Sequence, residues 1–486
     1  MQKIKKENLN NKKMQKPTFF KKVGFVSLGC DKNRVDTENI VTVLSSYSCF
    51  EFVGDSSQAN IIIINTCAFL KIARDEAKSV INQMAKFKTK GNLEKLIVCG
   101  CLPLLLKEEV LKQFKSVDAI FVPQDYDKID KHIFKLYEIE ALKPDKEVKG
   151  RVTTTPRHYS YLKVADGCNN RCAYCKIPFI RGFYKSQPLQ EVINEAQILS
   201  DRGSKELILV AQDLTRYGCD IKTNLVELLQ QLAKIKNVSW LRLLYCYPEK
   251  IDDALINEIK ENPKVVKYID VPLQHVSNNV LKLMKRRGGK KQIVCLIKTL
   301  RKQIKDIKIR TTFMVGFPGE TKKDFKELCV FLKKYKLDNV GFFKYSRESG
   351  TTSYDYENQV DELEKDRRLE IVQKIQHKIA QKQNKKLIGK TLKVLCDSYN
   401  SKYKFFIGRP YFSAPEIDFE VWFKSEKALT VGSFIDVKIV DFKEDCFIGE
   451  VRLWIYQIEL HYLEFYWYLL LFSFIYHNLF WLVVNC

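Results

Sequence analysis

Residues 161–175 read Tyr-Leu-Lys-Val-Ala-Asp-Gly-Cys-Asn-Asn-Arg-Cys-Ala-Tyr-Cys and place Cys168, Cys172 and Cys175 (the barrel cysteines) in a C-x3-C-x2-C spacing. Three neighbouring thiolates leave a tetrahedral structural metal one ligand short. They can instead hold three corners of a cubane iron–sulfur cluster and leave the fourth iron open, which points to chemistry rather than to a structural role. The alternatives are a zinc knuckle whose fourth ligand lies elsewhere in the chain, and three ordinary buried thiols.

The sequence around and after this run alternates short apolar segments with segments of helical length, which is typical of βα units. About six such units in roughly 220 residues predict an incomplete barrel of parallel strands, with its active site at the carboxyl-terminal rim. The cysteine run follows the first predicted strand and therefore lies on that rim. The predicted strands are Tyr161–Val164, Glu206–Val210, Trp240–Leu244, Tyr268–Val271, Lys308–Met314 and Val340–Phe343.

The first part of the chain, residues 23–123, also alternates apolar runs with helical patterns, so a parallel α/β sheet is expected. Cys30, Cys67 and Cys101 (the amino-terminal cysteines) each lie just beyond a predicted strand. The carboxyl ends of parallel strands share one edge of a sheet, where open α/β folds bind ligands. The topology thus predicts a second three-cysteine site, although Cys67 and Cys101 could equally be small buried hydrophobes. The expected strands are 23–28, 61–64, 96–98 and 119–122, and helices are expected around 36–46, 73–84 and 104–114.

The composition of the whole chain excludes several classes of protein. Its 486 residues are enough for about two to four domains. It has 15 cysteines, and its Lys-rich start lacks the apolar stretch and small-residue cleavage site of a secretory signal. Reduced thiols, some of them bound to metal, therefore fit better than a disulfide framework, and a cytoplasmic location is expected.

The formal net charge of +24 raises nucleic acid as a partner, because Lys and Arg that neutralise phosphates supply most non-specific affinity. The surplus is not gathered on one face. Residues 1–22 carry eight Lys against Glu7, a net of +7, whereas residues 391–452 hold nine Lys or Arg and ten Asp or Glu, a net of −1. No single binding surface follows from these counts, and no DNA partner is expected.

Pattern and composition divide the chain into six segments. The long charged stretch Glu362–Ile388 predicts a helix that leaves the barrel, and five short β-branched and aromatic runs after Thr391 predict a small all-β barrel. The segments are 1–21, a basic disordered arm; 22–136, an amino-terminal cluster domain; 137–156, a polar linker; 157–388, the partial (β/α) barrel; 389–452, the β module; and 453–486, an atypical hydrophobic tail.

Several runs resemble the methylthiotransferases, a branch of the radical S-adenosylmethionine enzymes. The C-x3-C-x2-C spacing, with aromatic Tyr174 before the last cysteine, is similar to the signature of the larger family. The resemblance covers about residues 22–452 in the expected order of cluster domain, radical barrel and TRAM module. The runs that carry it are 27–36 (Ser-Leu-Gly-Cys-Asp-Lys-Asn-Arg-Val-Asp), 65–69, 166–170, 177–182, 242–248, 270–275, 310–320, 345–348 and 408–418.

The resemblance implies a reaction and its cofactors. The barrel cysteines would carry a 4Fe-4S cluster whose open iron binds S-adenosylmethionine and generates a 5′-deoxyadenosyl radical. The amino-terminal cysteines would carry a second 4Fe-4S cluster that binds or supplies sulfur, and a second S-adenosylmethionine would give the methyl group. Because no side chain can abstract an unactivated hydrogen, this chemistry belongs to the cofactor.

Within the branch, the closest likeness is to the members that modify a ribosomal protein. Such enzymes add a methylthio group to the β-carbon of an aspartate in small-subunit ribosomal protein S-twelve, with electrons from a donor such as flavodoxin or ferredoxin. The balanced charge of residues 391–452 suits a protein substrate, since an RNA-binding module should carry a basic excess. The alternatives are a transfer-RNA methylthiotransferase acting on the modified adenosine next to the anticodon, and a zinc-stabilised RNA-binding module without catalysis.

Three further residues are candidates for contact with S-adenosylmethionine: Tyr174, Gly316 and Gly319. The glycines would let the backbone approach the cofactor closely. A turn alone would equally explain both of them.

The remaining polar residues near predicted strand ends fit structural roles. Gln212 and Asp213 face the expected rim, but Asp213 is as well placed to cap a helix. His275 fits a satisfied structural histidine, and Arg286 and Arg287 fit a solvated face.

The tail, 453–486, departs from the family, whose members end soon after the last strand. Phe465–Val484 is long enough to cross a bilayer, for which about 20 apolar residues are needed, and aromatic residues lie near its ends. Ser473, His477 and Asn478 tell against a span. An out-of-frame or read-through extension is the favoured interpretation, and no membrane association is expected unless the tail is a true anchor.

Overall fold

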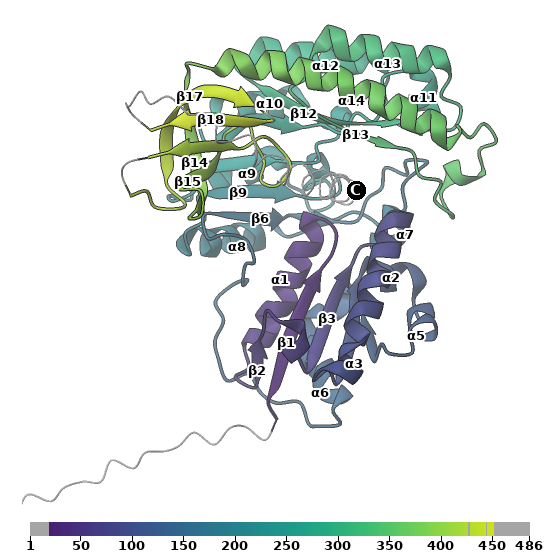
Figure 1. The fold of residues 1–486 in the computed structure, drawn as a ribbon, viewed down its shortest axis with the longest axis vertical. Helices are drawn as coiled ribbons and strands as arrows, with labels where there is room; N and C mark the ends of the chain where they lie inside the picture. Colours follow the sequence, from purple (N-terminus) through teal and green to yellow (C-terminus); the bar gives the residue numbers. More distant parts are fainter. Residues whose placement is uncertain (1–18, 426–427, 444, 452–486) are drawn as a thin grey trace, which may run out of the picture.

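The computed structural model describes residues 19–425, 428–443 and 445–451. Most of the expected arm, 1–21, and all of the expected tail, 453–486, lie outside these residues. Three units follow one another along the chain: a parallel α/β sheet, a larger partial barrel and a small closed β-barrel (Figure 1). Among the described residues, no helix is long and apolar enough to cross a membrane.

The amino-terminal sheet is parallel throughout, in the order β2-β1-β3-β4-β5. The isoleucines of β3 serve both faces: Ile61 and Ile63 join one core, and Ile62 and Ile64 join the other. Strands that are buried on both faces have continuous apolar sequences, which is why the sequence predicted most of this sheet. The strands are β1 (Lys21–Ser27), β2 (Phe50–Phe52), β3 (Ile61–Thr66), β4 (Lys95–Gly100) and β5 (Ala119–Phe121); the helices are α1 (Asp31–Ser45) and α6 (Ile129–Leu136) on one face, with α2 (Lys71–Ala85), α3 (Phe87–Lys90), α4 (Cys101–Leu106) and α5 (Glu109–Gln113) on the other.

Two details of this domain differ from the sequence prediction. The helix expected over 104–114 is instead two short helices, α4 and α5, because Lys107 between them has a left-handed φ of 51° that interrupts the helix. Strand β2 has no counterpart among the predicted strands. It is only three residues long and buries only Phe50, so it shows no measurable alternation.

The second unit is the predicted partial barrel, with six parallel strands in the order β13-β12-β11-β10-β9-β6. A two-stranded ribbon of β7 (Ala165–Asp166) and β8 (Lys185–Ser186) follows its first strand, with α7 (Ile177–Arg181) between them. The barrel strands are β6 (Tyr159–Lys163), β9 (Glu206–Val210), β10 (Trp240–Leu243), β11 (Val265–Asp270), β12 (Lys308–Val315) and β13 (Asn339–Lys344); the helices are α8 (Leu189–Asp201), α9 (Leu225–Ala233), α10 (Asp253–Glu261), α11 (Asn278–Leu283), α12 (Lys290–Gln303), α13 (Lys322–Tyr335) and α14 (Glu362–Asn384).

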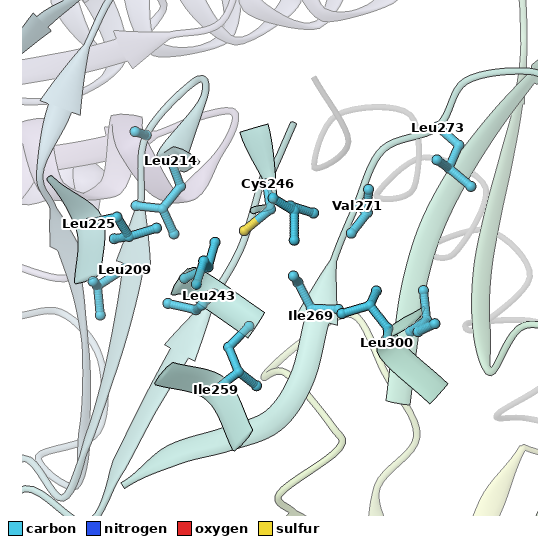
Figure 2. Packing of buried hydrophobic residues seen from close by; sticks show 14 of the residues in the cluster. Leu209, Leu214, Leu225, Leu243, Cys246, Ile259, Ile269, Val271, Leu273 and Leu300 are labelled. Atoms are coloured by element: carbon cyan, nitrogen blue, oxygen red, sulfur yellow. The ribbon is translucent and has the colours of Figure 1, made fainter. Parts of the chain in front are cut away.

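The outer face of this sheet forms the largest hydrophobic core (Figure 2). Leu209, Leu243 and Ile269 lie side by side in register on β9, β10 and β11. Helix residues such as Leu225 and Leu300 cover them. Fully burying one side chain of this size contributes about 1.5–3 kcal/mol, so the helical layer is firmly held.

The third unit is a closed five-stranded barrel, as the five short runs predicted. It packs on the inner face of the partial barrel, where Ile208, Trp240 and Tyr268 share one core with Phe412 and Phe423. The small barrel therefore covers part of the face of the large sheet that the barrel's own helices leave free, and Val35 of α1 joins the same core (Figure 1). Its strands are β14 (Thr391–Asn400), β15 (Phe405–Pro410), β16 (Val421–Lys424), β17 (Phe434–Lys443) and β18 (Cys446–Glu450).

Ion pairs from β15 and the segment after it fix the small barrel to both other units. Arg409 lies 2.9 Å from one carboxylate oxygen of Glu206, and Arg242 lies 2.6 Å from the other. Glu416 pairs with Arg34 of α1 at 2.9 Å. The Glu206 group is fully buried, whereas the Arg34 pair is partly exposed.

The segment expected to be a linker, 137–156, is held against the domains on either side of it. Asp145 accepts the backbone N–H of Ser48 at 2.8 Å. Arg151 pairs with Glu38 of α1 and, at 2.7 Å, with Glu195 of α8. Polar composition alone therefore did not indicate how closely this segment contacts its neighbours.

We expect Glu206→Gln to destabilise the protein by about 3–5 kcal/mol, the range for breaking a buried ionic group, because Arg242 would lose its ion pair and Arg409 would keep only Asp397. Glu416→Gln is the matched control and should cost less than about 1 kcal/mol, since its pair is partly exposed. Denaturant unfolding followed by circular dichroism measures both. Equal losses in the two variants would contradict the assignment of the buried group as the main contact.

Candidate functional site

The barrel cysteines lie in the loop between β7 and β8, beyond the carboxyl end of β6. Backbone N–H groups point at two of the sulfurs: Asn170 donates to Cys168 Sγ at 3.5 Å and Ile177 donates to Cys175 Sγ at 3.4 Å. Gly167 opens the loop with φ 75°, and a Cβ there would lie 2.2 Å from a backbone carbonyl oxygen. Only glycine fits this turn, so the loop geometry is set by the sequence.

The chemistry of these thiols fits a metal–sulfur group. Burial raises the pKa of Cys168 to about 11 and also raises the pKa of Cys175, and the neighbouring Cys172 adds to both shifts. Such thiols stay protonated unless a metal centre binds them as thiolates. Backbone hydrogen bonds to the sulfurs are among the means by which proteins tune a bound cluster. Among the described residues, no three His, Cys, Asp or Glu side chains are arranged to hold a single metal ion.

A cleft of about 1080 Å³, counted with the solvent at its mouth, opens beside the barrel cysteines. All three of them line it, and so does Tyr174, whose ring packs edge to face against Phe317 with centroids 6.3 Å apart. Phe69 and Leu70 of the amino-terminal domain line the same cleft. The cleft is therefore shared between two domains.

The amino-terminal cysteines lie at the carboxyl ends of three adjacent strands: Cys30 after β1, Cys67 after β3 and Cys101 after β4. The sheet order reverses direction between β1 and β3, which is where open α/β folds bind ligands. Burial raises the pKa of Cys67, and Cys101 and Cys30 add to the shift because negative charge on their sulfurs would repel a Cys67 thiolate. Cys99 lies inside β4 and is fully buried. The residues converge as the topology predicts, and cluster binding by them stays a prediction.

The amino-terminal cysteines do not themselves line the cleft in the described structure, but residues next to them do. Tyr245, just after β10, lines the cleft. Its hydroxyl donates to Asp31 at 3.3 Å, and Asp31 directly follows Cys30 in the chain. The second cysteine group is therefore adjacent to the wall of the cleft.

Arg181 connects the two cysteine groups. It lies at the end of α7, just after the barrel cysteines, and its guanidinium reaches into the amino-terminal domain. There it donates to Cys101 Sγ at 3.4 Å and to Asn33 Oδ1 at 2.5 Å. Burial alone would lower the pKa of Arg181. Cys101 and two carboxylates have the larger effect and raise this pKa, so the side chain stays charged.

The two carboxylates belong to a buried ionic cluster across the domain boundary. Arg181 pairs with Asp36 at 2.7 Å and with Asp166 at 3.2 Å. Lys163 of β6 pairs with the same two residues. Two cations and two anions thus neutralise one another where α1 meets the rim of the barrel.

Gly316 and Gly319 follow β12, and both have left-handed φ angles, 73° and 81°. A Cβ at Gly316 would lie 2.3 Å from the Lys365 side chain, and one at Gly319 would lie 2.7 Å from Leu283. Neither glycine lines the cleft in the described structure. Backbone conformation and packing account for both, and their contact with S-adenosylmethionine stays a prediction.

Arg286 does not belong to a solvated face, so the sequence interpretation of this residue was wrong. Its guanidinium lies over the Tyr247 ring, 4.0 Å from the centroid, and donates to the Pro272 carbonyl oxygen at 2.6 Å. One nitrogen lies 3.9 Å from Cys172 Sγ. The partners come from other loops of the rim, so nothing in the local sequence signals this role. Arg287 is exposed, as expected.

Two glutamine side chains of the rim also face the cleft. Gln212 and Gln274 line it, and their Oε1 atoms have no hydrogen-bond partner in the described structure. Asp213 makes no helix cap; it accepts a hydrogen bond from the side chain of Asn170 in the cysteine loop at 2.7 Å. His275 is fully buried and accepts a backbone N–H at its Nδ1, but its Nε2 has no hydrogen-bond partner in the described structure, so this histidine is not fully satisfied, contrary to the expectation.

Known families match the chain in three consecutive parts. Residues 22–122 match the Uncharacterized protein family UPF0004, residues 162–332 match the Radical SAM superfamily, and residues 388–451 match the TRAM domain. The partial barrel with three cysteines on its rim, together with these matches, defines a radical S-adenosylmethionine enzyme, which uses an iron–sulfur centre and S-adenosylmethionine.

Similar proteins cover nearly the whole chain. The ribosomal protein uS12 methylthiotransferase RimO of Acetivibrio thermocellus is 43% identical over 447 residues, which are 89% of this chain and 98% of the relative. RimO of Clostridium botulinum is 45% identical over 441 residues, with the same two shares. The chain belongs to the RimO family of ribosomal protein uS12 methylthiotransferases.

A solved structure supports the fold. The radical S-adenosylmethionine methyltransferase TsrM from Kitasatospora setae, with cobalamin and a 4Fe-4S cluster bound, superposes with a TM-score of 0.51 at 14% identity. The match covers 69% of this chain and 77% of that chain. The predicted fold class, an α/β cluster domain with a partial barrel and a small β-barrel, is confirmed.

Removing Arg181 should loosen the contact between the two cysteine domains. We expect Arg181→Gln to speed amide hydrogen exchange over residues 31–37 by about tenfold or more, because losing one member of a buried ionic cluster costs several kcal/mol. Exchange followed by mass spectrometry measures this. Arg171→Gln, in the same loop but exposed, is the control and should leave exchange unchanged. Identical exchange in both variants would show that Arg181 does not hold the domains together.

Proposed function

We propose that this chain methylthiolates the β-carbon of an aspartate in ribosomal protein uS12. The observation that carries the proposal is the presence of two three-cysteine groups beside one cleft between two domains. Inserting sulfur at an unactivated carbon needs a radical centre and a sulfur site at the same substrate atom, and cofactors supply such chemistry. The relatives named above are ribosomal protein uS12 methylthiotransferases by name, and the aspartate β-carbon is the target that the family resemblance implies.

The barrel cysteines would hold one 4Fe-4S cluster, which supplies the radical from S-adenosylmethionine, and the amino-terminal cysteines would hold a second, which supplies the sulfur site. The chain's own residues hold the two cluster sites in place relative to each other and shape the cleft. Arg181 fixes the two domains against each other, and Arg286 holds positive charge beside Cys172. Phe69, Leu70 and Tyr174 give the cleft apolar walls that limit access of water to the reacting atoms.

The proposal includes an electron donor of the flavodoxin or ferredoxin class and a cytoplasmic location. The radical cluster must be reduced for each turnover, and a donor of this class would supply the electron. Ribosomal proteins are made in the compartment where thiols are kept reduced, which suits the cysteine content.

The reaction itself is tested by mass spectrometry. Anaerobically reconstituted protein, incubated with uS12, a reductant and S-adenosylmethionine, should add one methylthio group to an aspartate-containing peptide of uS12. Cys175→Ala should give no product, because it removes a ligand of the radical centre. Modification of transfer RNA without any modification of uS12 would contradict the proposal and favour the transfer-RNA alternative.

The number of clusters is tested by iron analysis. The reconstituted protein should hold about eight irons per chain, and Cys67→Ala and Cys175→Ala should each hold about four, if each cysteine group binds one cluster. Cys99→Ala is the matched control, because this thiol lies inside β4 and should not be a ligand. Undiminished iron in Cys67→Ala would contradict the second site. Zinc without iron would favour the zinc-stabilised module.

A further inference from the structure

Lys32 is a buried cation in the wall of the cleft. It lies in the first turn of α1, two residues after Cys30, and is only 3% exposed. Its ammonium lies over the ring of Tyr245, 3.6 Å from the centroid, and both residues line the cleft. The amino-terminal domain thus delivers a positive charge to a site whose other main wall comes from the barrel.

The ring of Tyr245 is placed under Lys32 by a strained backbone. Tyr245 has a left-handed φ of 62°, which is unfavourable for a bulky residue and is retained only where surrounding structure enforces it. Its N–H donates to Asp270 at 2.9 Å, and its carbonyl accepts the N–H of Leu214 at 3.0 Å. Its hydroxyl donates to Asp31 at 3.3 Å. These contacts hold the backbone of Tyr245 in its unfavourable conformation and keep the ring against the ammonium of Lys32.

The ammonium of Lys32 has no carboxylate within ion-pair distance among the described residues. A buried charge without a partner is costly, and a cation–π contact offsets only part of that cost. The neighbouring carboxylate of Asp31 instead contacts the phenol of Tyr245. The ammonium is therefore available to pair with the carboxylate of a ligand.

The other cations of the cleft are already engaged. Lys344 pairs with Asp366 at 2.6 Å, and Arg286 contacts the Pro272 carbonyl, Tyr247 and Cys172. Of the described residues that line the cleft, none is Asp or Glu. A bound anion would therefore meet the charge of Lys32 with no carboxylate of the cleft wall competing for it.

We propose that Lys32 binds the side-chain carboxylate of the target aspartate and so selects an acidic residue as the substrate. This inference rests on the proposed function. The carboxylate of S-adenosylmethionine is the competing occupant, but that cofactor belongs to the barrel cysteines, and the cation that touches them is Arg286. Lys32 comes from the other domain, beside Cys30. Pairing the substrate carboxylate with Lys32 leaves its β-carbon, one bond away, facing the cleft.

The proposal is tested by binding measured on the cluster-loaded enzyme with two forms of uS12, the natural protein and one with its target aspartate replaced by asparagine. Wild-type enzyme should bind the aspartate form at least about 30-fold more tightly, the effect of a buried charge pair. Lys32→Met, which keeps the length of the side chain without its charge, should bind both forms equally within about threefold. Lys32→Arg should keep most of the preference, and Lys32→Gln should lose it.

Three controls separate this role from a structural one. Lys308→Met removes another lysine that lies over an aromatic ring, that of Phe412, away from the cleft, and should keep the preference for aspartate. Iron content should stay at about eight per chain in Lys32→Met, because the substitution spares all six cysteines. The affinity for S-adenosylmethionine should also be unchanged. If Lys32→Met loses iron, the comparison of the arginine and glutamine variants decides the question.

The outcomes distinguish this inference from the function on which it rests. If wild-type enzyme modifies uS12 but the methionine and glutamine variants still prefer aspartate as strongly as wild type, Lys32 does not bind the substrate carboxylate. If those variants lose affinity for S-adenosylmethionine instead, Lys32 serves the cofactor and the proposal is overturned. If wild-type enzyme neither binds nor modifies uS12, the proposed function itself fails.

Discussion

The buried ionic cluster of Arg181, Lys163, Asp36 and Asp166 is the contact on which the arrangement of the site depends. Isolated buried charges are unfavourable, so these side chains are stable only when both domains are docked. Arg181 follows the barrel cysteines in the chain and touches Cys101 of the other group. The same interaction that joins the domains therefore sets the position of one cysteine group relative to the other.

The small barrel depends on a similar principle. Arg409 shares the buried carboxylate of Glu206 with Arg242, and Asp418 accepts a hydrogen bond from Tyr268 at 2.7 Å. Arg409, Glu416 and Asp418 lie in the run 408–418 that contributed to the family resemblance, and they pair with Glu206, Arg34 and Arg310 outside the module. Two anions and one cation of the module are thus engaged elsewhere in the chain, so the charge count of residues 391–452 overstates the acidity of the module's free face. The inference from that count to a protein substrate is weaker than the inference from the site and the relatives.

The sequence predicted those parts of the site whose residues lie within one short motif or directly after an apolar strand. The barrel cysteines share one short run, and the amino-terminal cysteines each follow an apolar strand, so their meeting at one sheet edge follows from parallel topology. Lys32 and Arg286 carried no such signal. Their roles arise from Tyr245 and Tyr247, which are far away in the chain and are brought to them by the docking of domains and loops. Similarly, α4 and α5 read as one helix because a single left-handed residue, Lys107, leaves no mark on periodicity.

The central claim is that two cluster sites serve one cleft. Electron paramagnetic resonance of the fully reduced, reconstituted protein tests it directly, because two paramagnetic clusters held close together split each other's signals. The account predicts a coupled spectrum in the wild type that becomes a simple, unsplit spectrum in both Cys67→Ala and Cys175→Ala. A wild-type spectrum equal to the sum of the two variant spectra would show that the clusters do not share a site.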